Sequence, residues 1–377
     1  MRVALVTDGI YPFVIGGMQK HSFYLAKYLA QNSIHVDLYH TSQDIKIADK
    51  IDCFTEEEKT FITSIAIPFT KTDSFPGHYI REMRLYSSEI YKELQKRTVD
   101  FIYVQGLSGL KFLESRSLTK TPIGVNFHGL EMFQRAADIR SKAERFIFRR
   151  PVLKSLKNAE VVFSLGGKLT DLLLSNGIEK KKIIQIPIGI DPSWIRVEAV
   201  GKSEKRVFVF IGRYERRKGI EELTKVLTEL SNENFEFKFI GAIPEDKQIK
   251  NENIKYYGAI SDASKIKSIL KTTDVLVCPS YSEGMPTVIL EAMASGLAII
   301  ASNVGAVSEL VNEKNGILVE PGNIVQLKNA MIAFLNKPEE ELIDLKKKSI
   351  KIIEQDFLWE TIIKRTIFEI KQLVKIN

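Results

Sequence analysis

The chain has few cysteines and no long apolar run. Only Cys53 and Cys278 occur among its 377 residues, which excludes a disulfide-stapled fold and favours a reducing compartment. No apolar run approaches the roughly 18 residues of a membrane span. Residues 1–8 are typical of a short strand rather than a signal peptide. We therefore expect the protein in the cytoplasm, either free or at the inner face of the cell membrane.

Two motifs of nucleotide-dependent enzymes are also missing. Gly-x-Gly-x-x-Gly, the fingerprint of dinucleotide binding, does not occur, which counts against a nicotinamide enzyme. No Asp-x-Asp stands in an expected cleft loop, and the histidines show no metal-ligand spacing. The sequence therefore predicts neither a nicotinamide cofactor nor a required metal.

The length and the pattern of apolar runs predict two α/β domains. A chain of 377 residues exceeds what one hydrophobic core usually serves, and 44% hydrophobic with 27% charged residues is ordinary for a globular protein. Helical patterns, for example at 17–31, 79–97, 219–230 and 323–335, alternate with strand-like runs. Such alternation favours doubly wound parallel sheets covered by helices. We expect strands at 2–8, 35–41, 61–68, 101–106, 122–128, 161–165, 183–188, 207–212, 235–241, 254–257, 275–279, 298–302 and 316–320.

A polar stretch at 191–206, containing Pro192 and Gly201, separates the two series of strands and is the expected hinge. We predict a first domain over residues 1–193 and a second over 194–359. The run that begins at Phe357 and Trp359 opens an amphipathic helix, and we expect residues from about 360 to 377 to join the first domain.

The net charge of +7 is concentrated in residues 135–157. Eight bases stand there among apolar residues such as Phe146, Ile147 and Val152, against Asp138 and Glu144. Such a stretch is typical either of a helix that contacts an anionic membrane or of a domain helix with a solvated basic face. Nucleic acid is not indicated, since no recognisable nucleic-acid module is present.

The stretch 280–291 carries the strongest chemical signal. Glu283 and Glu291 stand eight positions apart, after a strand and across a turn-forming Gly-Met-Pro. Pro286 suits the start of a helix and Gly296 its end. The loop amides at 284–287 and the helix N-terminus would together face an anion. Glu291, near the second helical turn, can accept hydrogen bonds from neighbouring hydroxyls, as on a ribose.

Three further segments follow expected strands. Arg213 and Lys218 stand five apart after a strand that ends at Gly212, and two fixed cations there can hold a diphosphate. Arg216 and Arg217, between them, we expect on a solvated turn. Gly16 and Gly17 open a helix and let backbone amides approach an anion. His128 and Asp8 also end expected strands; for Asp8 we favour a cap or turn role over contact with an acceptor.

These segments, in this order, resemble retaining nucleotide-sugar glycosyltransferases of the GT-B fold, family 4. The resemblance lies in Glu283-x7-Glu291, in Gly212-Arg213-x4-Lys218-Gly219, in Gly16-Gly17 and in His128-Gly129. It covers most of the chain and is strongest over 207–320. The chain departs from the family at Ile188, where Asn is frequent, which puts that side chain's contact in doubt. Gly305-Ala306 stands where Gly-Gly is common, and we expect a small effect.

The resemblance implies two Rossmann-like domains that face a cleft, the first on the acceptor side and the second binding the nucleotide sugar. It implies a hexose-type donor, retention of configuration, and an acceptor hydroxyl on a saccharide or lipid-linked saccharide of envelope polysaccharide synthesis. No metal and no cofactor are expected. The implied catalytic residues are Glu283, Arg213, Lys218 and His128, and the implied donor-binding residues are Gly16, Gly17, Arg213, Lys218, Glu283, Gly284, Met285, Pro286, Thr287 and Glu291.

Two other classes of function are compatible with the same pattern. A sugar-nucleotide epimerase or a phosphorylase would share the fold but not the reaction. A non-catalytic subunit would bind nucleotide sugars or lipids without turnover, although intact Arg213, Lys218, Glu283 and Glu291 argue against it. UDP, GDP, ADP and TDP are not separated by these residues.

Overall fold

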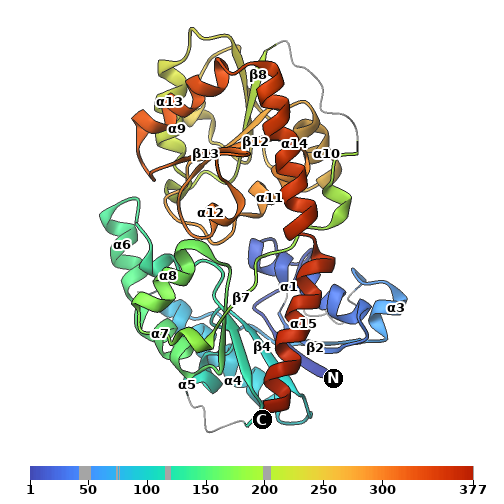
Figure 1. Ribbon diagram of the computed structural model, residues 1–377. Helices are drawn as coiled ribbons and strands as arrows, with labels where there is room; N and C mark the ends of the chain where they lie inside the picture. Colours follow the sequence, from blue (N-terminus) through green and yellow to red (C-terminus); the bar gives the residue numbers. More distant parts are fainter. Residues whose placement is uncertain (42–51, 74, 76, 115–119, 198–204, 377) are drawn as a thin grey trace. The chain divides into compact units, whose positions relative to one another are not determined.

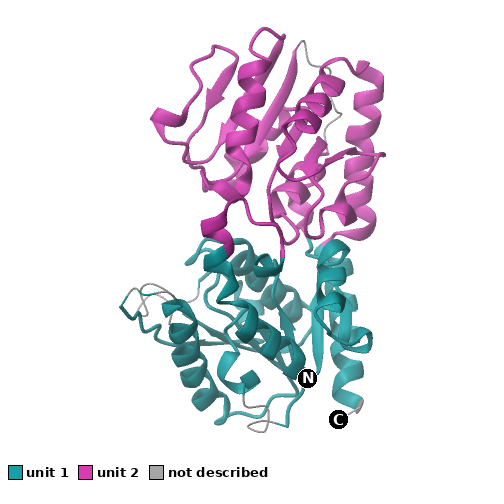
Figure 2. Cartoon of the chain, turned by 90° about the vertical axis from the view of Figure 1, so that its left-hand side faces the viewer, with its two compact units in different colours: residues 1–133, 143–189, 359–377 teal, residues 134–142, 190–358 magenta. Residues whose placement is uncertain are grey.

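The structure, a computed structural model, describes residues 1–41, 52–73, 75, 77–114, 120–197 and 205–376 (Figure 1). It divides into two compact units (Figure 2). Unit 1 comprises residues 1–133, 143–189 and 359–377, and unit 2 comprises 134–142 and 190–358. Residues 134–142, which we expected in the first domain, therefore belong to unit 2. Of the expected hinge at 191–206, residues 198–204 lie outside the described part of the chain.

Unit 1 is built on a seven-stranded parallel sheet with the order β3-β2-β1-β4-β5-β6-β7. In the central strand β1, residues 3–6 have no exposed surface, because helices cover both faces of the sheet. β1 pairs with β2 from Arg2↔His35 and with β4 from Val3↔Phe101. The strands are β1 (Arg2–Val6), β2 (His35–His40), β3 (Ile62–Ala66), β4 (Phe101–Gln105), β5 (Ile123–Asn126), β6 (Val161–Ser164) and β7 (Ile183–Gln185).

The last helix, α15 (Trp359–Ile376), belongs to unit 1 and packs on α1 (Gly17–Gln31) (Figure 1). Trp359 is fully buried and stacks on Tyr24 and Tyr28, with ring centroids 5.9 and 5.7 Å away. A Cβ on Gly189 would lie 2.7 Å from the Trp359 ring, so this position requires glycine. The other helices of the first half are α3 (Glu56–Lys59), α4 (His78–Leu94), α5 (Leu110–Glu114), α6 (Ile139–Phe146), α7 (Arg149–Asn158) and α8 (Gly167–Ser175), with 3-10 turns η2 (Glu131–Phe133) and η3 (Lys180–Lys182).

Unit 2 is built on a six-stranded parallel sheet with the order β10-β9-β8-β11-β12-β13. Its core contains buried phenylalanines from β8 and β9, among them Phe208 and Phe237. The strands are β8 (Arg206–Ile211), β9 (Phe235–Ile240), β10 (Ile254–Tyr256), β11 (Val275–Cys278), β12 (Ala298–Ser302) and β13 (Gly316–Val319). The helices are α9 (Ile220–Glu229), α10 (Ala263–Lys271), α11 (Thr287–Ala294), α12 (Val307–Leu310), α13 (Ile324–Leu335) and α14 (Glu339–Asp356), with 3-10 turns η4 (Pro192–Trp194), η5 (Arg216–Lys218) and η6 (Glu245–Lys247).

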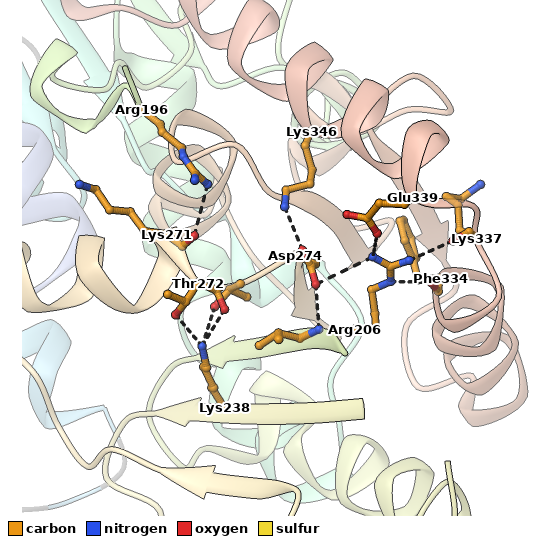
Figure 3. A network of polar contacts seen from close by, with 12 residues as sticks. Arg196, Arg206, Lys238, Lys271, Thr272, Asp274, Phe334, Lys337, Glu339 and Lys346 are labelled. Carbon is orange, nitrogen blue, oxygen red and sulfur yellow. Dashed lines mark hydrogen bonds and ion pairs between the residues drawn. The ribbon is translucent and has the colours of Figure 1, made fainter. Parts of the chain in front are cut away.

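A buried polar network fixes the amino ends of β8 and β11 (Figure 3). Asp274 accepts hydrogen bonds from Lys346 Nζ of α14 and from the Val207 amide, each over 2.9 Å. Arg206 donates to Glu339 over 3.0 Å and to two backbone carbonyls at the corner between α13 and α14. The network ties α14 to the sheet at the edge opposite to the carboxyl ends of the strands.

The predicted fold class is confirmed at the level of elements. Each expected strand overlaps an observed one, and all pairings in both sheets are parallel. The helix expected at 17–31 coincides with α1.

Candidate functional site

In unit 2, three predicted segments meet at one edge of the sheet. β8, β11 and β12 are adjacent strands, and residues 212–219, 279–287 and 303–306 follow their carboxyl ends. Because parallel strands end on the same side, these segments lie together. This edge is where open α/β sheets bind their ligands.

Glu283 and Lys218 form a buried ion pair at this edge. Lys218 Nζ and Ser280 Oγ both donate to Glu283 Oε1, over 2.6 and 2.7 Å. The side chains of Lys218 and Glu283 are 15% and 9% exposed. Burial on its own raises the pKa of Glu283, but the charges of Lys218 and Arg217 and the hydrogen bonds outweigh it and lower this pKa below its ordinary value. Glu283 is therefore an ionised acceptor at neutral pH.

The two arginines before Lys218 are held by acidic partners. Arg216 donates to both oxygens of Glu222, over 2.9 and 2.7 Å, and its guanidinium lies 4.9 Å from the centroid of the Tyr281 ring. Arg217 Nη1 lies 3.6 Å from Glu283 Oε2. The expectation of a solvated turn is therefore wrong for both, because η5 packs against the loop that follows β11.

Arg213 lies apart from this ion pair. Its side chain is 78% exposed, and its Nε lies 2.9 Å from Glu215 Oε1. Arg217 Nε lies 3.0 Å from the other oxygen of the same carboxylate. The structure thus brings Lys218 and Glu283 together and pairs Arg213 with Glu215 instead.

The loop at 284–287 is held by the segment after β12. Gly284 O accepts a hydrogen bond from the Ala306 amide over 2.8 Å. Gly305 has a φ of 55°, and a Cβ on it would overlap the carbonyl oxygens of Glu283 and Gly284. Position 305 therefore requires glycine, while Ala306 fits with no exposed surface.

The helix α11 begins directly after this loop. Pro286 is its N-cap residue, with a φ of −65°, and no side chain caps the first helical amides, which begin at Thr287. Free amides at a helix N-terminus attract anions. Glu291 lies in the second turn and is 6% exposed, and Met285 is 3% exposed. That these residues bind a nucleotide stays a prediction.

Gln134, from the first half of the sequence, contacts the Glu283 loop within unit 2. Its Nε2 donates to Glu283 O over 2.6 Å, and its Oε1 accepts from the Glu283 amide over 3.4 Å. The neighbouring Arg135 donates to Pro321 O over 2.9 Å. Sequence reasoning missed Gln134, because no motif marks it and it lies far along the chain from Glu283.

In unit 1, Gly16 is the N-cap residue of α1 and Gly17 its first residue. Asp8, after β1, accepts a hydrogen bond from Gln19 Nε2 over 2.7 Å and from Tyr79 OH over 3.4 Å. Burial raises the pKa of Asp8 above its ordinary value, against the lowering effect of these hydrogen bonds. A ligand-binding role for the two glycines stays a prediction.

His128 lies in a strained turn after β5. Its φ is 53°, in the left-handed region that non-glycine residues rarely adopt, and its amide donates to Asn126 Oδ1 over 2.8 Å. Its Nε2 lies 2.6 Å from Oε1 of Gln105, at the end of β4. Burial lowers the pKa of His128 to about 3, so the ring is neutral at physiological pH. Gln105 was missed, although a polar residue that ends an apolar strand is a readable signal.

A cavity of about 400 Å³ lies beside His128 within unit 1. Its wall is largely apolar, and its polar lining residues are Tyr79, His128, Glu131 and Arg145. The apolar lining residues include Met18, Leu107, Phe127, Met132, Phe148 and Val152.

The basic stretch is partly a packed domain helix. Val152 and Leu156 of α7 are buried, whereas Arg150 and Lys154 are exposed one turn apart. This is the domain-helix alternative of the sequence analysis. Phe146, just before α7, is 66% exposed beside these bases. Contact with a membrane stays a prediction.

Within the described ranges, every helix is too short or too polar to extend across a lipid bilayer. The same residues contain no group of three or more histidine, cysteine, aspartate or glutamate side chains arranged to hold a metal ion. Metal independence stays a prediction.

Two family models match the chain in succession. The model described as "Glycosyltransferase Family 4" matches residues 15–194, and the model described as "Glycosyl transferases group 1" matches residues 194–352. Together they cover most of the sequence, and the two matches meet close to the boundary between the two strand series.

Curated relatives carry related names. TuaC of Bacillus subtilis (strain 168), a glycosyltransferase named for teichuronic acid biosynthesis, is 29% identical over 196 residues, and the match spans 48% of each chain, about half of the relative's length. An N,N'-diacetylbacillosaminyl-diphospho-undecaprenol alpha-1,3-N-acetylgalactosaminyltransferase of Campylobacter jejuni is 28% identical over 216 residues, 55% of each chain.

Solved structures share the fold. Sucrose-phosphate synthase from Thermosynechococcus elongatus superposes with a TM-score of 0.82 at 19% identity, over 100% of both chains. Anabaena HepE, solved in complex with UDP and glucose, superposes with a TM-score of 0.69 at 16% identity, over 99% of this chain and 100% of that one.

Proposed function

Because the chain belongs to the family 4-like glycosyltransferases of the GT-B fold, we propose that it moves a hexose-type sugar from a nucleoside diphosphate sugar to an acceptor hydroxyl. We further propose that configuration is retained and that no metal is required. The observation that carries the proposal is the buried Lys218–Glu283 pair at the carboxyl ends of β8 and β11, directly before the uncapped N-terminus of α11.

The charges of this site match the charges of the reaction. Cleavage of the sugar–phosphate bond places positive charge on the sugar and negative charge on the departing diphosphate. In this proposal, Lys218 and the N–H groups of the 284–287 loop and of the first turn of α11 stabilise the diphosphate. Pro286 has no N–H and does not donate. Glu283 is held ionised, so it acts by accepting hydrogen bonds from sugar hydroxyls or by stabilising the electron-poor ring, rather than as an acid.

Arg213 adds a second cation by an exchange of partners. Its guanidinium is exposed and paired with the Glu215 carboxylate. A diphosphate offers the same paired oxygens with a larger charge, so the arginine fork can pass from Glu215 to the donor. In the proposal, these two protein cations, Lys218 and Arg213, take the place of a metal ion.

We place the acceptor on unit 1, where the cavity lined by His128 has an apolar wall and two charged residues, Glu131 and Arg145. An acceptor with both saccharide and apolar parts fits this lining. The name of the Campylobacter relative specifies a diphospho-undecaprenol-linked saccharide, which supports a lipid-linked or envelope polysaccharide acceptor here.

Calorimetric titration with UDP, GDP, ADP and TDP, first in EDTA and then with magnesium, tests the proposal. We expect selective binding of one nucleotide in EDTA, because the site holds its own cations. Binding only with magnesium would contradict metal independence. No binding under either condition would contradict the roles of Glu291 and Arg213 and favour a phosphorylase.

Turnover separates the remaining alternatives. Incubation of the matching nucleotide sugar with lipid-linked or oligosaccharide acceptors is expected to yield a new glycoside. Interconversion of the donor without a glycoside would identify an epimerase. Binding without consumption of the donor would identify a non-catalytic subunit.

A further inference from the structure

Gln105 joins two histidines in the interior of unit 1. Its side-chain amide has no exposed surface and lies at the carboxyl end of β4. The amide oxygen lies 2.6 Å from His128 Nε2, and the amide nitrogen lies 2.9 Å from His21 Nδ1. The two rings meet edge to face, with centroids 4.8 Å apart.

The amide determines which ring nitrogens carry protons. A glutamine oxygen can only accept a hydrogen bond, and the amide nitrogen can only donate one. His128 must therefore carry its proton on Nε2, and His21 must present an unprotonated Nδ1. A neutral imidazole has one N–H, so Nδ1 of His128 is left with a lone pair.

The surroundings keep both rings neutral. His21 is 4% exposed and lies against the ring of Trp359, with centroids 5.3 Å apart. Burial, followed by the proximity of His128, lowers the pKa of His21 well below its ordinary value. Two charged residues, Glu131 and Arg145, line the cavity beside His128. Within the described residues, neither forms a hydrogen bond with the His128 ring.

Nδ1 of His128 is accessible. It has no hydrogen-bond partner among the described residues. It is also not among the polar atoms that are both buried and unpaired, so part of its surface is exposed. His128 lines the cavity of about 400 Å³. A ligand beside this ring therefore meets a hydrogen-bond acceptor.

We propose that Gln105 is a positioning residue that fixes His128 as the Nε2-protonated tautomer, so that its Nδ1 accepts a hydrogen bond from a ligand hydroxyl or N–H. His21 accepts a hydrogen bond from the amide nitrogen, and Trp359 packs against the His21 ring. The ring then selects a donating group, such as a sugar hydroxyl, and disfavours a phosphate or carboxylate oxygen at this point. The inference rests on the proposed function only in placing a ligand beside His128.

The test is NMR of the full-length, ligand-free chain with 15N-labelled histidine. Two-bond 1H–15N spectra distinguish the tautomers, and the His128→Gln variant assigns the signals. We expect a protonated Nε2 and an unprotonated Nδ1 at neutral pH. A protonated Nδ1, or a doubly protonated ring, would overturn the proposal. Since no ligand is added, either failure leaves the nucleotide-binding test of the proposed function untouched.

Two substitutions test the role of Gln105 itself. Gln105→Glu introduces a carboxylate that only accepts, and an adjacent negative charge should raise the pKa of His128 by about 1–3 units. Gln105→Met removes both hydrogen bonds and should give a mixture of tautomers. If His128 keeps its pKa in the first folded variant, or its single tautomer in the second, Gln105 does not position it.

The matched control is Gln95→Glu. Gln95 is exposed at the end of α4 and donates to Tyr91 OH over 2.8 Å, so the same change in charge occurs away from the histidines. We expect no change in the His128 signals. An equal shift in this control would mean that the effect is one of net charge, and the proposal would fail.

Discussion

Lys218 is the residue whose removal should disturb the candidate site most directly. Lys218→Ala leaves the buried Glu283 carboxylate with Ser280 and the more distant Arg217. Breaking one side of a buried pair costs about 3–5 kcal/mol, and the remaining partners favour the lower end. We expect urea unfolding at neutral pH to show this loss.

The exposed pair Lys59–Glu56, with side chains 37% and 90% exposed, supplies the control. Lys59→Ala should leave the free energy of unfolding nearly unchanged, because an exposed ion pair contributes little. If Lys218→Ala and Lys59→Ala changed the free energy of unfolding equally, the Lys218–Glu283 pair would not be shielded from water.

The same pair predicts a pH dependence. The pKa of Glu283 in the folded chain is below the ordinary 4.5, so the unfolded chain takes up its proton at higher pH. The stabilisation is complete above the ordinary value and is lost as the pH falls through the lower folded value. Urea unfolding of the parent chain at a series of pH values should therefore show that this contribution is kept at neutral pH and lost only in acid, below about pH 4.5.

Glu291 offers a separate test of nucleotide binding. If its carboxylate accepts from ribose hydroxyls, Glu291→Ala should weaken nucleotide affinity by roughly 1.5–3 kcal/mol. Calorimetry with the preferred nucleotide measures this loss. Glu313→Ala, at an exposed turn after α12, serves as a control for charge, and an affinity unchanged by Glu291→Ala would rule out the ribose contact.

The site residues that could be predicted from the sequence belong to local motifs that directly follow strands. Lys218 and Glu283 were named from spacing and resemblance, and the structure brings them within hydrogen-bond distance. Gln134 and Gln105 were missed because their partners are distant in sequence, and a lone glutamine has no chemical signature. Arg216 was misread because its acidic and aromatic partners, Glu222 and Tyr281, stand on other elements.

At the scale of elements, the strands were predictable for a physical reason. Strands of a parallel sheet are buried on both faces, so they are continuous apolar runs bounded by polar turns. β11 and β12 are of this kind, with almost no exposed surface. Short helices such as α3 and α12 lack this signal, because four residues do not establish a period of 3.6.

The attachment of α14 to the sheet of unit 2 should depend on Lys346. The side chains of Lys346 and Asp274 are each 3% exposed, and the ion pair joins the helix to the start of β11 (Figure 3). Lys346→Met keeps the aliphatic stem but leaves Asp274 without its ammonium partner. We expect a loss of about 3–5 kcal/mol in the free energy of unfolding.

The control lies on the same helix. Lys348 pairs with Asp344 across one turn, with side chains 44% and 59% exposed. Lys348→Met should cost at most about 1 kcal/mol. A Lys346→Met variant as stable as this control would show that the network in Figure 3 does not hold α14 in place.

At the scale of the whole molecule, the exposed bases of α7 predict affinity for anionic bilayers. Arg150 and Lys154 are exposed one turn apart, near the exposed Phe146. Each base near an anionic surface contributes about 1 kcal/mol to the free energy of membrane binding. The double variant Arg150→Ser, Lys154→Ser should therefore bind phosphatidylglycerol vesicles more weakly by about 2 kcal/mol, as measured by sedimentation.

The same spacing occurs on α14, where Lys347 and Lys351 are exposed. Replacing those two by serine removes equal charge and should leave vesicle binding nearly unchanged. If the chain does not bind anionic vesicles, or if the α7 and α14 substitutions weaken binding equally, α7 is not a membrane-binding element.

Residues 134–142 belong to unit 2 although they lie within the first half of the sequence. This division bears on how such genes can be recombined. A crossover near position 190 would separate Gln134 from the Glu283 loop that it contacts, and a chimera would place the loop of another parent against it. Functional hybrids between relatives are therefore expected to carry residues 134–142 from the same parent as residues 190–358.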